Sequence, residues 1–149
     1  AYNYAARHYK RMHAFANAAR LAGIIFALGC IAVFESFAPA IIALFIGDAE
    51  TIRYGTDFLR IAVLATPFMI CNFQMSYTFQ AMGKGAKSLL LTSCRQGLVN
   101  IPLLFIMNGI FGLYGIVWTQ LMADAATVAL SLLLYLKMYR ELVKAEASR

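Results

Sequence analysis

The sequence has little charge for its length. Of its 149 residues, 13% are Asp, Glu, Lys or Arg and 62% are hydrophobic, whereas soluble domains carry roughly 25% charged residues. This composition excludes an ordinary soluble globular domain, and the high hydrophobicity also excludes a disordered chain. A membrane protein remains, with the lipid bilayer as its first partner.

Motifs of enzymatic chemistry are also lacking. The sequence contains no Gly-rich phosphate loop ending in Lys-Ser/Thr, no HExxH and no GxSxG. Its three cysteines lack the spacing of a metal site, so we expect them to pack between helices. We therefore predict that the protein is not an enzyme and has no cofactor and no metal of its own.

Long apolar runs predict an all-α protein with four membrane-spanning helices. Residues 61–83 carry no charge, and about 20 apolar residues suffice for a helix to cross the hydrocarbon core. A second run without charge, residues 96–123, is divided by Asn108 and Gly109, and a run from residue 21 is interrupted only by Glu35. We predict spans at about 15–35, 58–83, 88–107 and 113–136, with a short apolar segment, 40–46, at the interface or the helix end.

The basic residues orient these spans, because short loops rich in Lys and Arg stay on the cytoplasmic side. Four bases and no acid lie before or at the start of the first span, and three bases, Arg95 among them, lie in a loop over 84–95. The charge of +6 is thus a topology signal and does not indicate a nucleic-acid partner. We predict a multi-pass protein of the cytoplasmic membrane, with a cytoplasmic basic lead-in (1–14), a transmembrane part (15–136) and a cytoplasmic basic tail (137–149).

Polar residues recur at helical spacing inside three of the spans. Because a polar group that faces lipid is costly, we expect these stripes to converge on a protein interior. The stripes are Gln120, Asp124, Thr127 and Ser131; Gln96, Asn100, Leu103 and Met107; and Met69, Asn72, Ser76 and Phe79 beside Phe73, Tyr77 and Gln80.

Small residues and prolines add local detail. Gly23, Ala27 and Gly29 on the first span are small enough to allow close helix approach. Pro67 and Pro102 lie within the second and third spans. We expect a kink or weak point at each, because proline removes a backbone donor.

Asp124 is the only acid deep within a span, and an intramembrane carboxylate is by default a functional-site hypothesis. One interpretation makes it a coupling group for a proton or cation, or the counter-charge of a cationic ligand. The other makes it a hydrogen-bond partner of Gln120 or of the polar face of the third span. Thr127 and Asn100 join these two residues as candidates, and the sequence leaves both interpretations open.

Six short segments resemble, in order, those of one transporter family. The opening residues read AYNYAA and then YKR, which resembles the GYNYGA…KR segment at the end of the eighth helix of the multidrug and toxic compound extrusion (MATE) family. The other five segments lie at 43–48, 54–68, 79–85, 95–96 and 111–118.

The resemblance implies that the chain is a C-terminal fragment, helices nine to twelve of a twelve-helix, two-lobed antiporter. The family exports lipophilic, often cationic compounds in exchange for protons or sodium ions, so an N-terminal lobe of the same chain, a small-molecule substrate and a coupling ion are expected partners. Asp124 falls where many members have an acid. Some members place a carboxylate in the tenth helix. This sequence has no carboxylate between Ile61 and Gly83, so the resemblance implies that the coupling acids lie in the N-terminal portion. Phe73, Tyr77 and Gln80 are the expected cavity-wall residues.

Two other functions fit the same residues. The chain could be a complete four-helix, proton-coupled exporter that works as a dimer, with Glu35 at the outer end of the first span as its exchange carboxylate. It could instead be a non-transporting membrane subunit that only packs against partners. Membrane abundance and drug export distinguish the three hypotheses.

Overall fold

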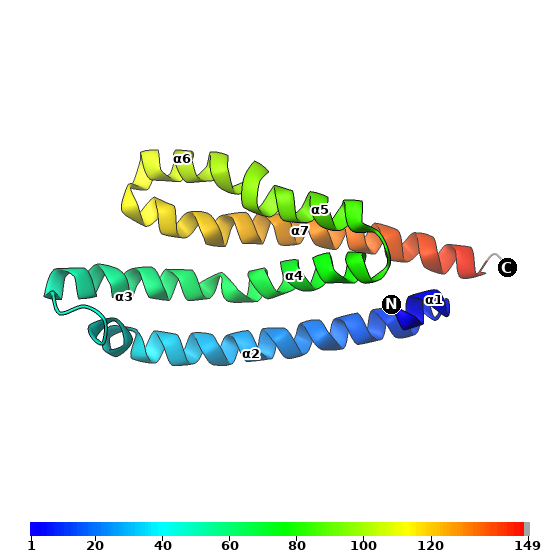
Figure 1. The fold of residues 1–149 in the computed structure, drawn as a ribbon, viewed down its shortest axis with the longest axis horizontal. Coiled ribbons are helices and arrows are strands. Elements are labelled where there is room, and N and C mark those ends of the chain that lie inside the picture. Colours follow the sequence, from blue (N-terminus) through cyan, green and yellow to red (C-terminus); the bar gives the residue numbers. More distant parts are fainter. Residues whose placement is uncertain (148–149) are drawn as a thin grey trace.

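A computed structural model describes residues 1–147, and its ordered elements are all helices (Figure 1). The amino and carboxyl ends lie at the same end of the bundle. The elements are α1 (Tyr2–Ala5), α2 (Tyr9–Ala43), α3 (Ala49–Leu64), α4 (Thr66–Ala81), α5 (Gly85–Ser93), the π-helical turn η1 (Cys94–Leu98), α6 (Asn100–Phe111) and α7 (Leu113–Ala147).

These elements form four rods long and apolar enough to cross a membrane. The rods are α2, α3 with α4, α5 with η1 and α6, and α7. Figure 1 shows the α3–α4 rod between α2 and α7, with α5 and α6 along the other side of α7. The predicted all-α fold with four membrane-length helices is thereby confirmed.

The helices extend beyond the predicted spans. The first runs over Tyr9–Ala43 and the last over Leu113–Ala147, each 35 residues long, or about 52 Å at 1.5 Å per residue. The first charged residues set the ends of the predicted spans. Lys and Arg are good helix formers, however, so the helical backbone hydrogen bonds continue past the apolar region. Residues 40–43 likewise complete α2 and form no separate segment. Residues 148–149 of the predicted tail lie outside the described residues.

Proline and glycine mark the points where the rods are interrupted. Pro67 lies in the first turn of α4, directly after the break at Ala65 that separates it from α3. Pro102 follows η1 in the first turn of α6. The turn between α6 and α7 is Gly112, whose φ of 60° and ψ of −137° suit glycine alone. The weak points predicted at Pro67 and Pro102 are therefore present.

Asp48 starts α3 as its N-cap. Its Oδ2 accepts hydrogen bonds from the Thr51 backbone N–H at 2.9 Å and from the Thr51 hydroxyl at 2.7 Å. These two bonds favour the ionised carboxylate and hold the pKa of Asp48 below its ordinary value. Asp48 thus fixes the residue at which the second rod begins.

The bundle exposes large apolar side chains and buries polar groups that would be costly in contact with lipid. Large side chains such as Phe26 and Phe105 are more than 70% exposed, whereas nine polar or charged residues among those that the structure describes are buried. An apolar cluster that includes Met75, Phe79 and Tyr135 packs α4 against α7. The polar residues of α4, η1 and α7 lie beside it and form the candidate site.

Candidate functional site

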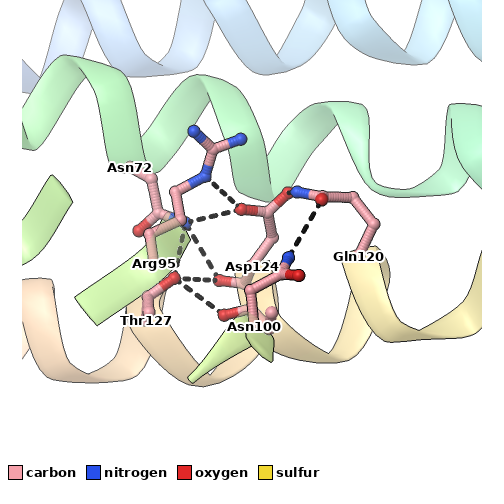
Figure 2. Close-up of polar contacts among 7 residues, drawn as sticks. Asn72, Arg95, Asn100, Gln120, Asp124 and Thr127 are labelled. Atoms are coloured by element: carbon pink, nitrogen blue, oxygen red, sulfur yellow. Dashed lines mark hydrogen bonds and ion pairs between the residues drawn. The ribbon is translucent and has the colours of Figure 1, made fainter. Parts of the chain in front are cut away.

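A connected polar network lies between α4, η1, α6 and α7 (Figure 2). Its centre is Asp124 of α7, which is 0% exposed. One carboxylate oxygen, Oδ1, pairs with Nε of Arg95 and lies 3.4 Å from Asn72 Nδ2. The other, Oδ2, accepts from Gln120 Nε2 at 2.7 Å. Asn100 extends the network by donating to Gln120 Oε1 at 3.2 Å.

Asn72 joins α4 to α7 through the same group. Its Nδ2 donates to the Asp124 backbone carbonyl at 3.0 Å and to Thr127 Oγ1 at 2.9 Å. The Thr127 hydroxyl in turn donates to the Ala123 carbonyl at 2.8 Å. Both oxygens of the Asp124 side chain therefore have donors, and the network ties three rods together.

Arg95 is the residue that the sequence interpretation misplaced. The sequence predicts it among the bases of a cytoplasmic loop, yet it is only 8% exposed and forms an ion pair with Asp124. The loop between the second and third rods is only 82–84, because helix α5 starts at Gly85. The sequence could have indicated this burial, because Arg95 lies within the predicted span 88–107. An arginine inside a span needs a partner of opposite charge.

The π-helical turn determines which residue of the third rod faces inward. The Val99 N–H donates to the Cys94 carbonyl at 2.9 Å, an i to i+5 bond that inserts one extra residue into the turn. Gln96, expected on the inner stripe, is exposed, and Arg95 lies inside instead. Beyond η1 the predicted stripe holds, because Met107 is buried and Asn100 is partly buried.

The three expected cavity-wall residues occupy different positions. Phe73 lies against the Arg95 guanidinium, with Cζ 4.6 Å from the ring centroid, and Tyr77 stacks on Phe73 with centroids 6.0 Å apart. Both aromatic rings reach the surface of the bundle, at 37% and 60% exposure. Gln80 lies apart from the network and donates to Ser88 Oγ at 2.8 Å.

Glu35 of α2 forms an ion pair outside this network. Its Oε2 lies 3.3 Å from Arg60 Nε of α3, and both side chains are about 40% exposed. Pro39 has no N–H to bond the Glu35 backbone carbonyl, and Arg60 Nη2 donates to that carbonyl at 3.3 Å instead. The pair thus joins α2 to α3 at the point where Pro39 interrupts the backbone hydrogen bonds of α2.

The glycines of the first rod differ in what surrounds them. An added Cβ at Gly23 would lie 2.7 Å from Ile70 Cγ2, and Ala27 is fully buried, so this part of α2 approaches its neighbour closely. At Gly29 a Cβ would meet nothing within 4 Å. The expectation of close approach is therefore wrong for Gly29.

The network can hold charge but has no metal-binding arrangement. Within residues 1–147, no group of three or more His, Cys, Asp or Glu side chains could hold a metal ion. The network contains one carboxylate and one guanidinium, with amide and hydroxyl groups as its other members. Four apolar rods around buried, paired charges define a multi-pass helical membrane protein.

Comparison with known proteins identifies the family. The MatE family model matches residues 1–106, so the chain belongs to the MatE family. The multidrug export protein MepA of Staphylococcus saprophyticus is 34% identical over 114 residues, which cover 76% of this chain and 25% of the relative. MepA of Staphylococcus aureus strain MSSA476 is 32% identical over 115 residues, with the same coverage.

The fold has a solved counterpart. A structure described as the outward-facing conformation of a multidrug resistance MATE family transporter superposes with a TM-score of 0.88 at 21% identity, over 95% of this chain and 32% of that chain. The chain spans about a quarter of the length of the curated relatives it matches. Family membership points to a transporter rather than an enzyme.

Proposed function

We propose that the native protein is a secondary active transporter that exports lipophilic, often cationic compounds in exchange for protons or sodium ions. The observation that carries this proposal is the match of the MatE family to most of the chain. The two MepA relatives, named multidrug export proteins, support the substrate class. The substrate and an N-terminal lobe of the same chain are the proposed partners.

The arrangement of the bundle supports a cytoplasmic location for both ends. The two termini and the α4–α5 turn lie at one end of the bundle, and basic residues lie there on α2 and α7. Bases flanking membrane helices favour the cytoplasmic side. We therefore propose a location in the cytoplasmic membrane with both described ends inside.

Asp124 and its partners act, in this proposal, as the element that keeps the rods together during transport. The carboxylate already has an arginine and two amides as donors, so a coupling ion would have to displace them. The 61–83 region has no acid. We therefore place the ion-coupling acids in the N-terminal lobe.

The function is tested by ethidium export. The native polypeptide is expressed in a bacterium that lacks its own efflux pumps, and intracellular ethidium fluorescence is followed after an energy source is added. We expect accumulation to fall relative to vector-only cells. Nigericin, which collapses the pH gradient, and sodium-free buffer then distinguish proton from sodium coupling. Normal membrane abundance without any export would instead favour the non-transporting subunit.

The four-helix exporter alternative is tested at Glu35. We expect Glu35→Gln to retain ethidium export, because an exposed ion pair with Arg60 contributes only about 0–1 kcal/mol and carries no exchange step in our proposal. Membrane abundance should also remain close to wild type. Loss of export at normal abundance would contradict this expectation and make Glu35 the exchange carboxylate.

A further inference from the structure

His13, near the start of α2, joins the first rod to the last. One ring nitrogen, Nδ1, lies 2.9 Å from the hydroxyl of Tyr135, and the imidazole stacks on Tyr139 with ring centroids 4.2 Å apart. Both tyrosines belong to α7, and Tyr135 is fully buried. The other ring nitrogen, Nε2, lies 3.0 Å from Asn17 Nδ2, one helical turn further along α2. The His13 ring thus connects two segments that are 122 positions apart in the chain.

Arg20 determines which way the Asn17 amide faces. Its Nη1 donates to Asn17 Oδ1 at 3.1 Å, and an arginine has donors only. The amide oxygen of Asn17 is therefore committed to Arg20, and the amide NH₂ group is directed at His13 Nε2. Arg20 is itself held by α4, because its Nε donates to Gln74 Oε1 at 3.3 Å and Gln74 Nε2 donates to the Ala16 carbonyl at 2.8 Å. The amide thus has one favoured orientation.

These contacts require the neutral form of the His13 ring. An amide NH₂ group donates and does not accept, so Nε2 must accept from it and carry no proton. The single proton of the neutral imidazole then lies on Nδ1, which donates it to the Tyr135 hydroxyl. A second proton would place an N–H against the Asn17 NH₂ group. Turning the amide over would supply an acceptor to His13 but take it from Arg20.

The charges around the ring favour the same form. Among the described residues, Arg20 is the charged group that acts on His13. The packed elements contribute uncharged groups, which are Tyr135 and Tyr139 of α7 and, through Arg20, Gln74 of α4. His13 precedes the predicted span 15–35, and its partial burial, together with the Arg20 charge, lowers the pKa of its imidazole below the ordinary value. The Tyr139 face attracts a cation but does not supply the acceptor that a second proton needs.

We propose that His13 is a proton-binding switch that holds the start of α2 against α7 while its ring is neutral and releases it when the ring is protonated. The sign follows from linkage. The separated state has an ordinary imidazole and binds the proton more tightly, so the contact is stable at neutral pH and weakens as the pH falls below about 6.5. The switch goes beyond the proposed export function, because it adds a response to acidity and does not depend on which compound is exported.

The test measures the distance between α2 and α7 in the full-length protein as the pH changes. Nitroxide labels are attached through Lys10→Cys and Arg140→Cys, at two exposed positions, in a cysteine-free variant held in nanodiscs. Double electron–electron resonance is expected to show one distance population at about pH 8 and a growing population of longer distances toward about pH 5. His8→Gln is the matched control. His8 is exposed and precedes α2, so this variant should keep the transition.

Two further variants separate the switch from a general effect of acid. His13→Gln removes the titrating group and should give the same distances throughout the pH range. Asn17→Asp supplies a carboxylate that accepts from the protonated ring, so the midpoint should fall by at least about one pH unit, or tenfold in proton binding. Unchanged distances in the wild-type protein, a transition that persists in His13→Gln, or a wild-type midpoint in Asn17→Asp would each overturn the switch. None of these measurements requires export, so the proposed function stands or fails separately.

Discussion

Replacing Arg95 with methionine is expected to remove most of the protein from the membrane fraction. The substitution leaves the fully buried Asp124 carboxylate without its positive partner. Loss of one member of a buried ion pair costs about 3–5 kcal/mol, a large part of the roughly 5–15 kcal/mol that stabilises most domains. Quantitative immunoblots of membranes, together with the unfolding temperature in detergent, measure the effect.

The matched rescue is the double variant Arg95→Met/Asp124→Leu. We expect it to recover most of the abundance, because two apolar side chains of similar size replace both charges and leave none unpaired. Arg53→Met serves as the control for loss of an arginine, since Arg53 is exposed and lies outside the network. Wild-type abundance of the single Arg95→Met variant would contradict a structural role for the pair.

Replacing Gly115 with alanine is expected to destabilise the bundle even though alanine is the better helix former. Helix propensity alone favours alanine by about 1 kcal/mol. However, a Cβ at Gly115 would overlap the backbone carbonyl of Met107 in α6, and a backbone group cannot swing aside as a side chain can. Overpacking of this kind costs about 1–3 kcal/mol or more, so we expect a lower unfolding temperature in detergent.

Two other glycines supply a graded comparison. At Gly29 an added Cβ meets nothing within 4 Å, so Gly29→Ala should leave stability unchanged or slightly higher. At Gly23 the nearest atom is the Ile70 Cγ2 methyl at 2.7 Å, which a change of side-chain rotamer can relieve. Gly23→Ala should therefore fall between the other two. Equal unfolding temperatures for all three variants would contradict the close α6–α7 packing.

Much of the fold could be predicted from composition and periodicity. The runs without charge predict four membrane-length rods, and the structure has four. The stripe on the last rod is also correct, since Asp124, Thr127 and Ser131 are each no more than 2% exposed. The helix ends could not be predicted, because charged residues end the apolar region without ending the helical hydrogen bonds.

The arginines of the bundle show where prediction from the sequence stopped. Charge counting places Arg95 in a loop and treats the four bases near the start of the first span, Arg20 among them, as flanking charges. In the structure Arg20 donates to Gln74 at 3.3 Å, while Arg60 and Arg95 pair with Glu35 and Asp124. Charge counting places such residues along the membrane normal but cannot say which neighbour they reach, because their partners lie up to 54 positions away in the chain.

The amino-acid sequence by itself determined the class of protein, the number of membrane rods and the inner face of the last rod. Those features depend on local composition and on spacing within one helix, which a single segment contains. Only the tertiary structure decided that Arg95 rather than Gln96 faces inward and that it pairs with Asp124. That outcome depends on one extra residue in a π-helical turn and on contact between separate rods, which helical periodicity in one segment cannot specify.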